Sequence, residues 1–501
     1  MSEPASWPLL STLLSLPLLG ALLATLWRRE AGAQWVALSS AVLTLLCSLL
    51  IVATFDSQDP DFQLLDSASW IPGVNIHYLV GVDGLSLLFL PATALLFCGA
   101  IVAGWRRRHA PAAAAAPPGV YFALLLLLEA ATLGVFCALD SILFFCFWEF
   151  TLLPLYFLVS LWGLGASRQA AAVRYFLVML AGGVPLLFGL LALAFGHAEQ
   201  GGALHFDLPT LLATALPERT QYLVFLLLLA GFGVKVPLLP LHTWLPALAM
   251  GAPAAVTAVL VGLKLGVYGL IRFAIPLAPL AARELHWLLA GFGTVAILYG
   301  SVAALAQSNL RAVLAYASLS HVGLVVLGLA SFSVSALQGA LLQLLHFSVA
   351  ASGGFLVLAF LQRRSDSTDL SQLGGVIHRM PLLSGFFLFF GLAGIGLPGT
   401  SGFPGELLII VETLHSHTGA GLAALFAMVL AAAAFLSPFR QAFLGPLRNP
   451  DLATAEDLLP RELALLLLPT LLILAVGVYP RPILELLRPS AEAWVAALAG
   501  L

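Results

Sequence analysis

The chain has 501 residues, of which 61% are hydrophobic and 9% are charged, and its mean hydropathy is +1.03. Its formal net charge is −3, and its longest run of basic residues is Arg106-Arg107-Arg108. These values exclude a soluble globular protein and give no signal for nucleic-acid binding. They predict a multi-pass protein whose main partner is the lipid bilayer.

Apolar windows of about twenty residues predict about fourteen spans, and hence an all-α polytopic membrane protein. The predicted spans lie near residues 8–27, 34–55, 79–104, 119–139, 141–163, 171–195, 221–246, 254–274, 285–306, 308–330, 333–361, 380–416, 419–444 and 462–485. Arginines gather in alternate loops, and acidic residues predominate in the others. By the positive-inside rule we expect a bacterial inner (plasma) membrane protein with both termini on the periplasmic side.

Residues 1–110 are expected to form an N-terminal three-helix segment with an external loop. The acidic stretch 56–78 is too polar to span a membrane, so we predict a small surface hairpin there. The segment 106–118 is the predicted linker before the functional core, and the start of the chain lacks the basic stretch of a cleavable signal peptide. The cysteines lie in apolar runs without the spacing of disulfides or metal ligands, and they are Cys47, Cys98, Cys137 and Cys146.

Lys235 lies inside an apolar run of membrane-spanning length, two residues before Pro237. Proline interrupts a helix, so the stretch from Gly231 to Pro246 predicts a broken span. Lys235 and Lys264 are the only lysines among the 21 basic residues. A coding bias towards arginine would leave lysines at span ends, because a charge at mid-membrane costs at least ~2.5 kcal/mol. A buried amine can release its proton whereas a guanidinium stays charged, so both lysines are candidates for proton transfer.

A second interruption is predicted over 394–406, where glycines and prolines recur. Each interruption falls in the fourth span of a five-span unit, the first over residues 111–280 (spans 4–8) and the second over 281–445 (spans 9–13). An odd number of spans makes two such units run in opposite directions, so we predict two inverted half-channels with broken helices. A C-terminal helix and tail follow over 446–501. The alternative is that Gly and Pro are simply common in membrane helices.

Other ionisable groups fall inside the predicted spans. Glu149 lies in mid-span, Glu406 follows the second interruption, and His242, His321 and His346 lie within spans or at their edges. A lone buried histidine is ordinarily only hydrogen-bonded, but several of them can form a relay. A Lys–Glu pair can stay charged in the membrane, and separating the pair favours proton release. The combination suggests a proton path.

Three further acids carry less information. Asp83 and Asp140 lie near span ends, where helix capping is the simpler role. Glu129 lies in a Leu-rich stretch without a recognisable motif. The chain shows no metal-ligand spacing, phosphate loop or nucleotide motif, so we expect no metal, cofactor or redox site on it.

Several motifs resemble those of the antiporter-like membrane subunits of proton-pumping NADH:quinone oxidoreductase (respiratory complex I), especially the subunit M or mitochondrial subunit 4 type. The resemblance runs from about residue 60 to the C-terminus. Its motifs are Val82-Asp83-Gly84-Leu85-Ser86, Phe147-Trp148-Glu149, Gly231 to Pro246, Lys264 with Tyr268-Gly269-Leu270-Ile271-Arg272-Phe273, Ala315-Tyr316-Ala317-Ser318-Leu319-Ser320-His321, and Leu397-Pro398-Gly399-Thr400 through Glu406.

The resemblance implies fourteen helices, two inverted repeats and a hydrated axis of charged groups. It implies that Glu149 and Lys235 form the ion pair of the first half-channel, that Lys264 connects the halves, and that Glu406 is the terminal proton carrier. His321 resembles the relay histidine. The implied partners are L-like and N-like membrane subunits, together with subunits that hold FMN, iron–sulfur clusters and quinone.

Three departures from the family pattern stand out. The stretch 247–253 is apolar where the family has a polar loop. Between Pro253 and Lys264 the chain has about two residues fewer, a shift of over half a helical turn unless a local bulge or an earlier helix start absorbs it. The relay position of the eleventh span falls on Phe347, with His346 about 100° round the helix.

Two alternatives therefore remain beside the complex I hypothesis. The same fold serves multi-subunit Na⁺/H⁺ antiporters, membrane-bound hydrogenases and proton-coupled inorganic-carbon uptake complexes. A different class is an assembly subunit whose proton path is broken. An independent solute symporter is less well supported, because no polar substrate pocket stands out.

Overall fold

The computed structural model describes residues 8–27, 29–105 and 117–499, so most of the predicted linker 106–118 lies outside the described residues. In chain order, the elements as far as residue 329 are α1 (Leu9–Leu26), α2 (Glu30–Thr54), β1 (Gln63–Ile71), η1 (Pro72–Val74), β2 (Ile76–Val82), α3 (Phe89–Ala103), α4 (Pro118–Cys137), α5 (Ser141–Phe150), α6 (Leu152–Trp162), α7 (Arg168–Gly201), α8 (Leu208–Leu212), α9 (Glu218–Lys235), η2 (Leu241–Thr243), α10 (Trp244–Gly251), α11 (Ala254–Gly262), α12 (Leu265–Gly269), the π-helical η3 (Leu270–Ala274), α13 (Pro279–Glu284), α14 (His286–Leu305) and α15 (Leu310–Leu329).

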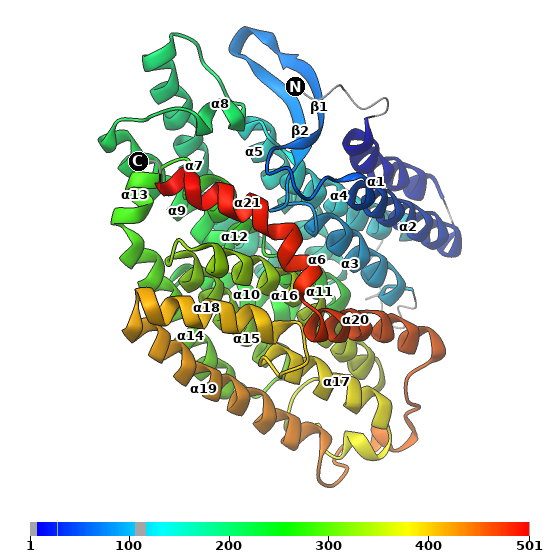
Figure 1. Ribbon diagram of the computed structural model, residues 1–501. Coiled ribbons are helices and arrows are strands. Elements are labelled where there is room, and N and C mark those ends of the chain that lie inside the picture. The colour runs from blue at the N-terminus through cyan, green and yellow to red at the C-terminus, as the bar shows by residue number, and fades with distance from the viewer. Residues whose placement is uncertain (1–7, 28, 106–116, 500–501) are drawn as a thin grey trace.

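The remaining elements complete the second half of the bundle (Figure 1). They are α16 (Val334–Ser365), η4 (Val376–His378), α17 (Pro381–Gly394), α18 (Gly402–Ser416), α19 (Thr418–Phe443), η5 (Pro450–Thr454), α20 (Pro460–Val478) and α21 (Arg481–Ala499).

Within the described residues, 11 helices are long and apolar enough to cross a membrane. The other three predicted spans correspond to the 15-residue α3 and to two interrupted helices. The all-α polytopic architecture is confirmed, whereas the number of fourteen spans stays a prediction. α4, α15 and α16 are buried on most sides, and α19 and α20 face outward.

Both predicted helix interruptions are present. α9 ends at Lys235, and regular helix resumes at Trp244 after a stretch with Pro237 and Pro240. α17 ends at Gly394 and α18 begins at Gly402. Proline removes a backbone donor, and Gly396 has a φ of +73° that favours glycine, so neither stretch continues the helix.

Two features lie outside the helical bundle. β1 and β2 pair antiparallel as the predicted hairpin, with Ser67 opposite Leu79. The last residues differ from the predicted tail, because the sequence after Pro480 forms the amphipathic helix α21. α21 crosses the molecule from α20 towards α13 (Figure 1), where Arg283 donates to the Leu498 carbonyl.

Candidate functional site

Lys235 is held where the first broken helix meets the α5–α6 junction. Its Nζ donates to Thr151 Oγ1 at 2.9 Å and to the Trp148 carbonyl at 3.3 Å. The same ammonium lies 3.8 Å from the centre of the Trp148 ring, which is within the range of a cation–π contact. Because α9 ends at Lys235, the amine sits at the free carboxyl end of a helix, which favours a cation.

Glu149 lies on α5 between these contacts, but it does not form a direct ion pair with Lys235 among the described residues. Its Oε1 is buried without a hydrogen-bond partner. A Cβ on Gly183 of α7 would lie 2.3 Å from this oxygen. Gly183 therefore makes the room in which the carboxyl sits.

An internal cavity joins Lys235 to Lys264. It has a volume of about 50 Å³, and Thr132, Thr151 and Tyr175 also line it. A water needs roughly 10–15 Å³ of such volume, so a few waters fit between the two amines. The cavity therefore offers a hydrated link between the first half of the molecule and its centre.

Lys264 lies at a break in the eighth predicted span. α11 ends at Gly262, α12 runs from Leu265 to Gly269, and the π-helical η3 follows at once. Extra residues of a π-helix change the helix register and often mark functional sites. The π-helical turn follows Lys264, whereas the helix break at Leu263 and Lys264 lies at the end of the shorter Pro253–Lys264 stretch. Lys264 Nζ donates to Ser318 Oγ on α15.

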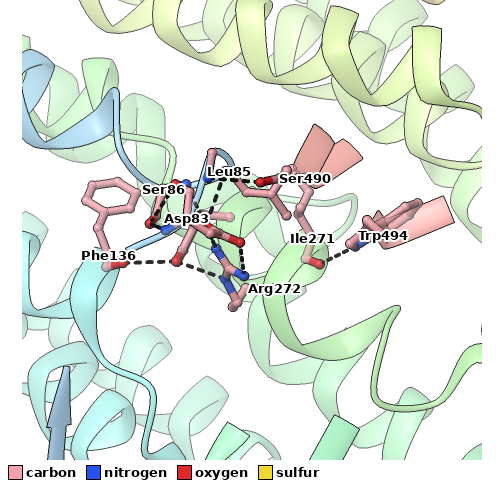
Figure 2. A network of polar contacts seen from close by, with 10 residues as sticks. Asp83, Leu85, Ser86, Phe136, Ile271, Arg272, Ser490 and Trp494 are labelled. Carbon is pink, nitrogen blue, oxygen red and sulfur yellow. Dashed lines mark hydrogen bonds and ion pairs between the residues drawn. The ribbon is translucent and has the colours of Figure 1, made fainter. Parts of the chain in front are cut away.

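The π-helical turn is anchored by a buried polar network (Figure 2). Arg272 donates from Nη1 to Asp83 Oδ2 at 2.8 Å and also from Nη2 to Asp83 Oδ1, and from Nε to the Tyr268 hydroxyl at 3.1 Å. From α21, Trp494 Nε1 donates to the Ile271 carbonyl at 2.8 Å. Asp83 thus does more than cap a helix, and α21 is tied to the segment that carries Lys264.

Beyond Lys264, two further cavities lead to Glu406. The first, about 50 Å³, is lined by Ser318, Ser320 and His321, and the second, about 20 Å³, shares Ser320 and His321 and reaches Glu406. His321 Nδ1 lies 3.9 Å from Glu406 Oε1. Gln343 donates to the same oxygen at 3.2 Å. These contacts bring His321 and Glu406 together as expected for a relay.

A glycine again makes room for the second glutamate. A Cβ on Gly396 would lie 1.9 Å from Glu406 Oε2, which is buried without a hydrogen-bond partner. Gly183 and Gly396 stand in the same relation to Glu149 and Glu406. Both carboxyls are therefore packed against a glycine, although the sequences around the two glycines differ.

The other two histidines lie off this row. His346 Nδ1 is 2.7 Å from Ser401 Oγ, in the second helix interruption. Its neighbour Phe347 packs against His321 with ring centres 3.9 Å apart and ring planes tilted by 43°. His242 Nε2 is 3.2 Å from the Tyr299 hydroxyl. The structure thus brings His321 to Glu406, and it gives His346 and His242 separate hydroxyl partners.

Three residues that contact the row, and one that contacts His346, were not predicted individually from the sequence; they are Thr151, Ser318 and Gln343, and Ser401. Small polar residues are common in membrane helices, so only proximity identifies these. Asp140 caps α5 through Ile142 N and Leu143 N, as predicted. Buried Arg311 donates to the Ala252 carbonyl and to Thr257 Oγ1, so it fastens the end of the apolar stretch 247–253.

Cavities of water size lie along the row from Lys235 to Glu406. From one end to the other it contains Glu149, Lys235, Lys264, His321 and Glu406. Within the residues that the structure describes, no cluster of three or more His, Cys, Asp or Glu could hold a metal ion. Such an arrangement can pass a proton between amines, imidazole and carboxylates through water and hydroxyl groups.

Comparison with known proteins gives a consistent result. Residues 138–431 match the family described as NADH:quinone oxidoreductase/Mrp antiporter, TM. The chain is 35% identical to the NADH-quinone oxidoreductase subunit M of Rhodobacter capsulatus, over 96% of this chain and 95% of that protein. It is 34% identical to subunit M of Escherichia coli, over 95% and 96% of the two chains.

Solved structures are similar over nearly the whole length. One chain of respiratory complex I from Thermus thermophilus matches with a TM-score of 0.87 at 30% identity, over 98% of this chain and 99% of that chain. A chain of the Mrp complex from Dietzia sp. matches with a TM-score of 0.84 at 23% identity, over 98% of each chain. The latter likeness shows a common fold.

Proposed function

This chain belongs to the NADH:quinone oxidoreductase and Mrp antiporter membrane-subunit family, and on that premise we propose that it translocates protons as the subunit-M-type component of a respiratory complex I. The observation that carries the proposal is the row of ionisable groups from Glu149 to Glu406, with water-sized cavities along it from Lys235 onward. The full-length relatives named subunit M support this type over the Mrp type.

In the proposed path, a proton reaches Glu149 and Lys235 in the first half-channel. It then crosses the central cavity to Lys264. Ser318 and His321 carry it onward to Glu406, which releases it. Each step moves a proton between neighbouring nitrogen and oxygen atoms, and no electron transfer occurs on this chain. His346 and His242 lie beside the path and do not carry the proton. They stabilise the broken helices, His346 through Ser401 and His242 through Tyr299.

The partners follow from this role. We expect L-like and N-like membrane subunits on either side, and redox subunits with FMN, iron–sulfur clusters and a quinone site elsewhere in the complex. With arginines gathered in alternate loops, the positive-inside rule supports a bacterial inner membrane protein with both termini periplasmic.

Replacing Lys235 by Met tests the proposal. Met keeps much of the apolar stem but cannot carry a proton, so we expect the assembled complex to lose proton pumping. NADH-driven acidification of inverted vesicles gives the readout, and complex assembly is followed by native gels. Arg440→Gln, an exposed cation on α19, is the matched control and should pump normally. Normal pumping by Lys235→Met would contradict the proposed role.

An assembly subunit with a broken path is the second candidate. The apolar stretch 247–253 and the position of Phe347 beside His321 favour it. Purifying the tagged chain with its partners and measuring pumping in the Lys264→Met variant separates the two. Loss of pumping with intact NADH oxidation supports an active path, whereas unchanged pumping supports the assembly role.

A further inference from the structure

Glu129 is an ionisable residue that the proposed path does not use. It lies on α4 and is fully buried. In the described part of the chain, neither of its carboxyl oxygens has a hydrogen-bond partner, and no ion pair joins it to a cation. Burying an ionised carboxylate without compensation is very costly, and most buried polar groups are hydrogen-bonded. A Glu with a purely structural role would therefore lower the stability of the fold relative to Leu at this position.

A second unpartnered polar atom lies on α3, the helix that packs against α4. α3 and α4 run antiparallel, because Phe89 stacks on Phe136 at one end and a Cβ on Gly104 would meet Tyr121 at the other. This register places Thr93 on α3 within about one helical turn of Glu129. Thr93 is also fully buried, and its Oγ1 lacks a hydrogen-bond partner. Three unpaired oxygens at one interface are the environment that holds an internal water.

Glu129 is also one turn from the central cavity. Leu128 and Thr132, on either side of it in the sequence, line the cavity that contains Lys235 and Lys264. Residues i and i+3 of a helix lie on neighbouring faces, about 5–6 Å apart at Cβ. Thr132 Oγ1 donates to the Leu128 carbonyl, and its lone pairs are free to accept a proton from the Glu129 side.

Proton exchange by Glu129 would keep the buried group of amines and carboxyls electrically neutral. The cavity has two amines, but Glu149 is the only carboxyl that the proposed path supplies near it. With both lysines protonated and Glu149 ionised, the group carries a net charge of +1. Ionised Glu129 would bring that charge to zero, and a proton returned to Glu129 would leave the buried carboxyl neutral when a lysine is deprotonated.

We propose that Glu129 is a side-branch proton carrier that exchanges a proton with the Lys235–Lys264 cavity through Thr132 and a water bound at Thr93. In this step the O–H bond of the Glu129 carboxyl breaks and an N–H bond forms on a lysine, while the intervening water and hydroxyl each accept one proton and donate another. No oxidant or reductant is required. This inference rests on the proposed proton-pumping function.

Glu129→Gln tests the branch, because Gln keeps the shape and hydrogen-bonding capacity but cannot ionise. In the complete complex we expect a severalfold lower pumping rate with NADH oxidation in uncoupled membranes retained. Glu412→Gln, outside the row, is the matched control, and Lys235→Met reports on the main path. If Lys235→Met abolishes pumping but Glu129→Gln pumps normally, the branch is wrong and the proposed function stands. If Lys235→Met pumps normally, the proposed function itself fails.

Infrared difference spectroscopy of the wild-type complex gives a second test, which does not depend on whether Glu129→Gln folds correctly. Between resting and NADH-driven wild-type complex, we expect a change in a carboxylic-acid C=O band that shifts in D₂O and is absent from Glu129→Gln. Thr93→Val should shift this band, because it removes the hydroxyl that holds the water. A Glu129 band that stays constant in both states would mean a permanently protonated structural residue and would overturn the inference.

Discussion

At the scale of single residues, two glycines leave the room that the glutamates of the proposed path occupy. Gly183 lies against Glu149 Oε1, and Gly396 lies against Glu406 Oε2. The close approach excludes a Cβ at both positions. Each of the two carboxyls thus depends on the absence of a neighbouring side chain, and substitution of either glycine should displace it.

Gly183→Ala should displace the Glu149 carboxyl and lower pumping strongly. Ala stabilises an isolated helix by about 0.5–1 kcal/mol relative to Gly, so helix propensity alone predicts no loss. Vesicle acidification and complex yield measure the two effects separately. The control is Gly291→Ala on α14, where an added Cβ meets nothing within 4 Å. Equal pumping by the two variants would show that Glu149 tolerates the displacement.

Gly396→Ala should impair pumping through both crowding and backbone strain, since its φ is +73°. Gly399→Ala isolates the strain, because Gly399 has a φ of +92° but open space around its Cβ position. We expect both variants to lose some yield and the Gly396 variant to lose more pumping per assembled complex. A similar loss in both would assign the effect to the backbone.

At the scale of elements, the Asp83–Arg272 pair joins the β2–α3 connection to the π-helical turn after Lys264. Both side chains are almost fully buried. Breaking a buried pair from one side leaves an uncompensated charge, whereas replacing both members by apolar residues is often tolerated. The contribution of this pair to the free energy of unfolding can therefore be tested by replacing one member or both.

Asp83→Asn should lower the free energy of unfolding by about 3–5 kcal/mol, because Arg272 keeps its charge. Thermal unfolding of the purified complex in detergent measures the change. The double variant Asp83→Leu with Arg272→Met should recover much of the stability. If the double variant is stable but pumps slowly, the pair also positions Lys264, and normal pumping would limit the pair to a structural role.

A histidine pair outside the spans offers a test by pH. His286 Nδ1 lies 2.7 Å from His417 Nε2, between the ends of α14 and α18. Partial burial, and then the neighbouring His286, lower the pKa of His417 below its ordinary value of 6.5. The unfolded chain then binds more protons, so stability should decrease as pH falls below about 6.5. His417→Gln should flatten this pH dependence of the unfolding temperature, and an unchanged slope would exclude His417 as its source.

At the scale of the whole molecule, Ser318 is the contact between the two halves of the proposed path, since Lys264 Nζ donates to it. Ser318→Ala removes the hydroxyl without adding volume, so we expect slower proton transfer between the halves and a severalfold lower pumping rate. Ser384→Ala is the control, because this buried serine donates to the Met380 carbonyl at the start of its own helix. Equal rates in the two variants would show that water alone bridges the gap.

The sequence by itself determined the membrane class, the two helix interruptions, the hairpin and the identity of the buried charges. These features are local, because apolar run length, proline and glycine act within about twenty residues. Its place near a span end likewise predicted that Asp140 caps a helix. The sequence analysis missed α21, where charges recur three or four residues apart after Pro480 and signal an amphipathic helix rather than a tail.

Only the tertiary structure decided which buried groups meet. Each residue turns a helix by about 100°, so a shift of one position sends His346 to Ser401 and leaves Phe347 against His321. Lys235 bonds Thr151 and the Trp148 carbonyl, with Glu149 beside them, and Glu129 is left without a partner. These outcomes depend on rotation and register between distant helices, and no local pattern in the sequence specifies either.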